Sequence, residues 1–178
     1  METTMRNGLT ILFVFSIALL RLIPHPPNLV PMTAICLFAG SHFKMRLLKW
    51  TVPLVAILVT DLIGFQLTEM TLYLYLGYAL IVATGRRIED NAALARLLNT
   101  SICGTLIFFV VSNFGFWQCT RIYAPTLSGL GVCYIQAIPF LLKSVVADAF
   151  YVVLIFTAFR LIKSASLGAF NSTRQVRA

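Results

Sequence analysis

The sequence predicts an all-α integral membrane protein with six transmembrane helices. Hydrophobic residues make up 59% of the 178 residues and charged residues only 11%, whereas an ordinary soluble domain has about 25% charged residues. The apolar residues fall into runs that approach the length of a bilayer span, and the charges cluster between the runs. We therefore expect one transmembrane helical domain over residues 1–163, followed by a basic, disordered cytoplasmic tail over residues 164–178.

Six apolar runs mark the expected helices: 8–23, 30–43, 50–66, 71–85, 99–117 and 143–163. Several prolines between positions 24 and 31 separate the first helix from the second, and Gly85 followed by Arg86 and Arg87 ends the fourth. No small-residue cleavage site follows the first run, so we interpret it as a retained helix rather than a signal peptide. The segment 86–98 combines charges with an apolar stripe, which is typical of a helix lying on the inner membrane surface.

The stretch 131–142 is apolar but short, since a transmembrane helix needs about 17–25 residues. Pro139 also interrupts it. We expect a re-entrant or surface-lying segment before the last helix, rather than a further span.

Lysine and arginine residues predict the orientation. With the amino end inside, only Arg21, Arg121 and Lys143 of the 14 basic residues fall on the outer side. This distribution predicts a multi-pass membrane protein with both termini in the cytoplasm. The net charge of +8 then reflects loops that meet anionic headgroups, and no nucleic-acid partner is expected.

Polar side chains gather at one depth in the outer third of the predicted bilayer. A charge within the membrane costs about 2.5–3.5 kcal/mol on insertion scales, so these residues should face protein or water. They form either a structural ion-pair cluster or a polar pocket open to the outside. In the pocket interpretation, the basic residues pair with the acids or bind an anionic group. The candidate substrate-binding residues are Arg21, Asn28, Asp61, Asn113, Trp117, Lys143, Asp148 and Tyr151.

Motifs of catalysis are absent: the sequence contains no G-x-S-x-G, no H-E-x-x-H and no P-loop. Neither the cysteines nor the histidines show the spacing of a metal site, so we expect no cofactor and no metal. The protein is not expected to be an enzyme, although Asp61 and Asp148 keep a membrane enzyme as a third alternative. Whether Cys119 and Cys133 form a disulfide is a question that the sequence leaves open.

Several stretches resemble a family of small bacterial six-helix transport-like proteins of uncharacterised function. They are Arg21–Ala34 with Leu37–Gly40, Asp61-Leu62, Asn113–Trp117, Gly129–Phe140, and Asp148 with Tyr151. That family is similar in turn to the substrate-binding S component of energy-coupling factor (ECF) transporters. The resemblance implies a location in the bacterial cytoplasmic (inner) membrane and an S-component-like bundle with a pocket near the outer face. It also implies an energy-coupling module as a partner. The small-residue patch by which S components dock is not evident, because Leu20 follows Ser16 at the matching spacing.

The sequence thus predicts a membrane transport protein that binds a small organic solute, vitamin- or metabolite-like, near the outer face. The alternative is a non-transporting membrane scaffold that organises other membrane proteins. The solute, the coupling to ATP through a partner or to an ion, and the oligomeric state stay open.

Overall fold

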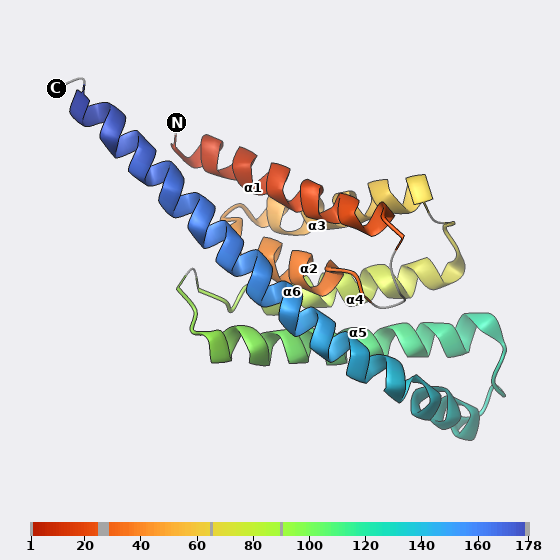
Figure 1. Ribbon diagram of the computed structural model, residues 1–178. Coiled ribbons are helices and arrows are strands. Elements are labelled where there is room, and N and C mark those ends of the chain that lie inside the picture. The colour runs from red at the N-terminus through yellow and green to blue at the C-terminus, as the bar shows by residue number, and fades with distance from the viewer. Residues whose placement is uncertain (1, 25–28, 65, 90, 177–178) are drawn as a thin grey trace.

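The computed structural model describes residues 2–24, 29–64, 66–89 and 91–176, and every regular element among them is a helix (Figure 1). This confirms the predicted all-α class. The first α-helix begins and the last ends at the same end of the molecule. The elements are α1 (Glu2–Leu19), the 3-10 turn η1 (Leu20–Leu22), α2 (Met32–His42), α3 (Arg46–Gly64), α4 (Glu69–Gly85), α5 (Leu94–Thr120) and α6 (Leu127–Val176).

Three of the helices are long and apolar enough to cross a membrane: α3, α5 and the part of α6 from Leu127 to Ser164. Residues 7–22 and α2 are apolar but shorter. Large apolar side chains point outward on several helices, with Leu62, Leu72 and Val146 exposed by 65%, 76% and 72%. A soluble monomer rarely exposes large contiguous areas of apolar surface. The exposed apolar side chains of this protein therefore fit a molecule surrounded by lipid.

Helix α2 forms the centre of the fold. Every residue from Met32 to Gly40 is buried, and α2 packs against α1, α3, α4, α5 and α6. Its 11 residues span about 16 Å, well short of the roughly 30 Å hydrocarbon core of a bilayer. A short helix is tolerated at membrane depth when protein surrounds it, because its ends then find partners there.

Two glycines allow α2 and α4 to touch through their backbones. A Cβ atom added at Gly40 would meet the carbonyl oxygen of Val82, and one added at Gly85 would meet the carbonyl oxygen of Leu37. Backbone atoms of packed helices cannot move aside as a flexible side chain can. The close approach of α2 and α4 therefore depends on the missing side chains at these positions.

Helix α6 continues without a break through residues 131–142, where the sequence predicted a separate re-entrant or surface segment. The expected boundary at Lys143 is therefore wrong. Pro139 lies inside the helix, where a missing N–H group and a steric clash bend the axis without ending it. Figure 1 shows the first turns of α6 running in a different direction from the long remainder. The helix also extends over residues 164–176, for which the sequence predicted disorder.

Part of the segment 86–98 packs against the helix bundle. Its last residues belong to the first turn of α5, and the side chains of Ile88, Ala92 and Leu97 are buried in the core, whereas Leu94 is 57% exposed. The placement of this segment on the inner membrane surface stays a prediction.

Candidate functional site

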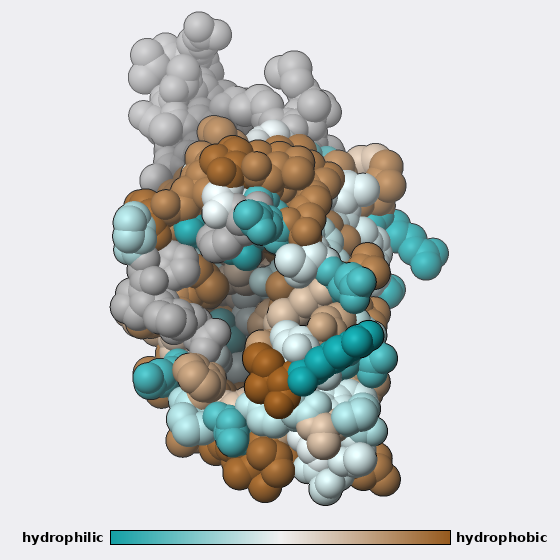
Figure 2. All heavy atoms as spheres, turned by 90° about the vertical axis from the view of Figure 1, so that its right-hand side faces the viewer, coloured by the Kyte–Doolittle hydropathy of each residue, from teal (hydrophilic) through white to brown (hydrophobic). Residues whose placement is uncertain are grey.

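A cavity of about 570 Å³ lies between α2, α4, α5 and α6, and Arg21 of η1 also lines it. Figure 2 views the molecule from the end at which α5 ends and α6 begins, and that face is hollowed near its middle. In the predicted orientation, this is the outer end. The lining includes the exposed Gln136 and the partly exposed Tyr123, whose hydroxyl donates to Oε1 of Gln136 over 2.8 Å.

The walls of the cavity are mainly apolar and aromatic, with a few polar groups among them. This composition is typical of pockets that hold small organic molecules. Phe108 stacks on Tyr78 with ring centroids 5.0 Å apart, so part of the wall is a continuous aromatic surface. The aromatic lining residues are Tyr78, Phe108, Phe109, Phe116, Tyr123 and Phe140, and the uncharged polar ones include Thr33, Thr105, Ser112, Asn113, Gln136 and Ser144.

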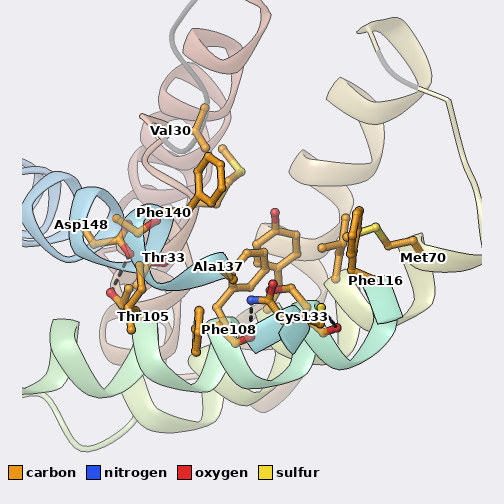
Figure 3. Close-up of a pocket in the computed structure, with 18 of the residues that line it drawn as sticks. Val30, Thr33, Met70, Thr105, Phe108, Phe116, Cys133, Ala137, Phe140 and Asp148 are labelled. Carbon is orange, nitrogen blue, oxygen red and sulfur yellow. Dashed lines mark hydrogen bonds between the residues drawn. The ribbon is translucent and has the colours of Figure 1, made fainter. Parts of the chain in front are cut away.

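Asp148 on α6 places a carboxyl group on the cavity wall, although its side chain is almost fully buried at 6% exposure. The hydroxyl of Thr105 on α5 donates a hydrogen bond of 2.7 Å to Oδ2 of this group. Thr33 at the start of α2 lies beside the same carboxyl group (Figure 3). Three helices therefore hold Asp148 in position. Within the residues that the structure describes, no basic side chain forms an ion pair with it.

Arg21 and Asp61 form a buried ion pair next to the cavity, with side chains 12% and 8% exposed. The hydroxyl of Tyr75 donates to the second oxygen of Asp61 over 2.9 Å. Arg21 lines the cavity but Asp61 and Tyr75 do not. Asp61 thus neutralises and orients Arg21, and the remaining formal charge on the wall comes from Asp148.

The structure brings three of the predicted site residues to the cavity: Arg21, Asn113 and Asp148. The side-chain amide of Asn113 donates to the carbonyl oxygen of Phe109 over 2.8 Å, within its own helix. Asp61 reaches the site only through Arg21. Asn28 lies outside the described residues.

The other predicted site residues do not line the cavity. Trp117 donates from Nε1 to the carbonyl oxygen of Ala124 over 2.9 Å and so ties down the segment after α5. The Tyr151 hydroxyl reaches the carbonyl oxygen of Leu29 over 3.4 Å, and Lys143 is exposed. The hydrogen bonds of Trp117 and Tyr151 therefore join segments of the chain and do not contribute to a ligand site.

Thr33 and Thr105, which lie beside the carboxyl group of Asp148, are not among the site residues predicted from the sequence. A helical pattern could have pointed to Thr105, since Ser112 follows it by seven residues, or about two turns, on the same face of α5. The disulfide left open by the sequence is absent: Cys119 and Cys133 are both free.

The sequence matches a family model over residues 1–171, and the chain belongs to this family, described as a family of unknown function (DUF6580). The match spans every residue that lines the cavity. No curated protein and no solved structure matches the chain. The expected membership in an uncharacterised family is confirmed, and the function has to be argued from the cavity itself.

Proposed function

We propose that this DUF6580 protein is a membrane transport protein that captures a small organic solute near the outer face of a bacterial cytoplasmic membrane. The observation that carries the proposal is an aromatic-walled cavity of about 570 Å³ with a buried carboxyl group on its wall. The volume falls within the range of about 300–1,000 Å³ that is usual for small-molecule sites.

The placement of Asp148 favours ligand binding over a purely structural role. A buried charge without a partner is costly, and structural carboxylates in membranes are normally paired. Asp61 follows that rule, because it pairs with Arg21. Asp148 instead lines a cavity and, among the described residues, accepts hydrogen bonds only from hydroxyl groups. A group that is expensive to bury and open to a cavity is suited to meeting a ligand.

The arrangement of the chain agrees with six spans and cytoplasmic termini. α1 begins and α6 ends at one end of the molecule, and the hollowed face lies at the other (Figures 1 and 2). Because Lys44, Arg46 and Arg86 lie near the end that carries the termini, the positive-inside rule favours that end as cytoplasmic. The cavity then faces the outside.

The resemblance to ECF S components supports solute capture as the role. The sequence has no nucleotide-binding motif, so energy for uptake has to come from a coupling partner or from an ion gradient. A partner would dock without the small-residue patch of S components, since Leu20 occupies one of the matching positions.

A membrane scaffold is the second candidate. It is favoured by the length of α6, which extends to Val176, beyond the ends of the other helices (Figure 1). The function of a scaffold would not change when residues inside the cavity are substituted.

Filling the cavity tests the proposal without any knowledge of the solute. Ala137 lines the cavity and is 8% exposed, so Ala137→Trp should occupy the solute space and abolish binding. Val146 lies on the same helix but is 72% exposed on the outside, and Val146→Trp is the matched control. Native mass spectrometry of protein taken gently from its own membrane should find a non-lipid small molecule on the wild type and on Val146→Trp, and none on Ala137→Trp.

Two results would count against solute capture: a wild-type protein free of any small molecule, or equal occupancy in Ala137→Trp. A partner protein that co-purifies with all three variants to the same extent would instead favour the scaffold.

A further inference from the structure

The charges around the cavity are unbalanced. Arg21 and Asp148 are the charged side chains that line it within the described residues, and Asp61 lies directly behind Arg21. Because Arg21 and Asp61 neutralise each other, the three groups leave one negative charge, at Asp148. In the low dielectric of a membrane protein, an anionic solute would be repelled by this carboxylate, whereas a cation would be attracted to it.

The aromatic lining favours the same sign of charge. The face of an aromatic ring carries negative electrostatic potential and attracts cations, especially where water is excluded. Figure 3 shows Asp148, Thr33 and Thr105 on one side of the cavity and Phe116 on the opposite side, with Phe108 between. A solute that reaches from Asp148 across the cavity therefore passes the aromatic side chains of Phe108 and Phe116.

The geometry argues against a bare metal ion as the occupant. Hard cations need about six to eight oxygen ligands, and transition metals need several His, Cys or carboxylate side chains. Among the residues described, no group of three such side chains could hold a metal ion. The cavity of about 570 Å³ is also many times larger than an ion, which favours an organic molecule as the carrier of the positive charge.

We infer that the solute is a small organic cation, such as a protonated or quaternary amine, with its charged nitrogen at Asp148 and its apolar part against the aromatic wall. This inference rests on the proposed function and specifies the ligand of the same cavity.

Matched probes that differ mainly in charge test the inference. Choline and benzylammonium are the cations, 3,3-dimethylbutan-1-ol and benzyl alcohol their neutral counterparts, and benzoate is the anion. Binding is measured by calorimetry on the full chain in lipid nanodiscs. We expect the cations to bind at least about tenfold more tightly than their neutral counterparts, and benzoate not to bind.

Asp148→Asn removes the charge but keeps an oxygen that accepts from Thr105, so the fold should survive. We expect it to weaken the binding of the cations by roughly 30-fold or more while leaving the neutral probes unchanged. Asp148→Glu keeps the charge and should retain the preference for cations. A general structural defect would weaken all probes together, which distinguishes it from loss of the charge.

The inference is overturned if the alcohols or benzoate bind as tightly as the cations, or if Asp148→Asn keeps the preference for cations. In both cases the pocket itself still binds a solute, so the proposed function stands. If no probe binds, the charge of the molecule found on the wild type by mass spectrometry decides: a cation supports the inference, and a neutral or anionic molecule overturns it. A wild type that carries no molecule and binds no probe contradicts both proposals.

Discussion

Asp61→Leu is expected to lower the free energy of unfolding by about 3–5 kcal/mol, one of the largest effects of any single substitution in the chain. The pair that Asp61 forms with Arg21 is buried, with side chains 12% and 8% exposed. Removing the carboxylate leaves the guanidinium group in a low-dielectric environment without its counter-charge. The hydroxyl of Tyr75 loses its acceptor in the same step.

A double-mutant cycle isolates the charge effect. Arg21→Met combined with Asp61→Leu removes both charges and should recover most of the stability that Asp61→Leu alone loses. Unfolding in a denaturing detergent, followed by circular dichroism, gives the free energies. The matched control is the ion pair between Arg96 and Glu89, whose side chains are 53% and 78% exposed.

Because that control pair is exposed to screening, Glu89→Gln should change stability by no more than about 1 kcal/mol. If Asp61→Leu costs no more than Glu89→Gln, the ion pair between Arg21 and Asp61 is not buried as described.

Gly40→Ala should destabilise the fold by about 3 kcal/mol, at the upper end of the usual cost of overpacking. The added methyl group would meet the backbone carbonyl oxygen of Val82, which can move only if α4 shifts as a whole. α2 is the central helix and contacts every other α-helix, so its displacement would disturb the cavity as well. Thermal unfolding in detergent measures the loss.

Gly131→Ala is the matched control, because a Cβ atom at Gly131 would have nothing within 4 Å. An alanine in a helix is more favourable than a glycine by about 0.5–1 kcal/mol, so this variant should be slightly more stable than the wild type. Equal destabilisation by the two substitutions would contradict the close contact of α2 with α4.

Local signals in the sequence located the helices well where a stop signal is strong. The fourth expected helix, 71–85, is found as α4 over Glu69–Gly85, because glycine followed by two arginines ends a helix whatever surrounds it. Pro139 gave the opposite result. Whether a proline ends a helix or bends it depends on what packs around it, and here the helix continues to Val176.

The candidate site was predictable in part for a similar reason. Arg21, Asn113 and Asp148 could be found because a polar group in an apolar run has to face the protein interior. The pairing of Asp61 with Arg21 depends on which helices are neighbours, so the sequence left it open. Thr33 gave no signal, and Thr105 could be suspected only from its spacing to Ser112, since threonine in a helix often bonds only to its own backbone.

The central question is whether the cavity contains water and opens to the outer face of the membrane. Ser144 lines the cavity, whereas Val146, two residues further along α6, is 72% exposed on the outside of the bundle. The most direct measurement compares Ser144→Cys with Val146→Cys in intact cells treated with a membrane-impermeant thiosulfonate, with the modified position identified by peptide mass. An outward-open cavity predicts rapid modification at position 144 and none at position 146, where lipid prevents the reactive thiolate from forming. No reaction at position 144, or reaction only when the reagent reaches the cytoplasmic side, would contradict an outward-facing binding pocket.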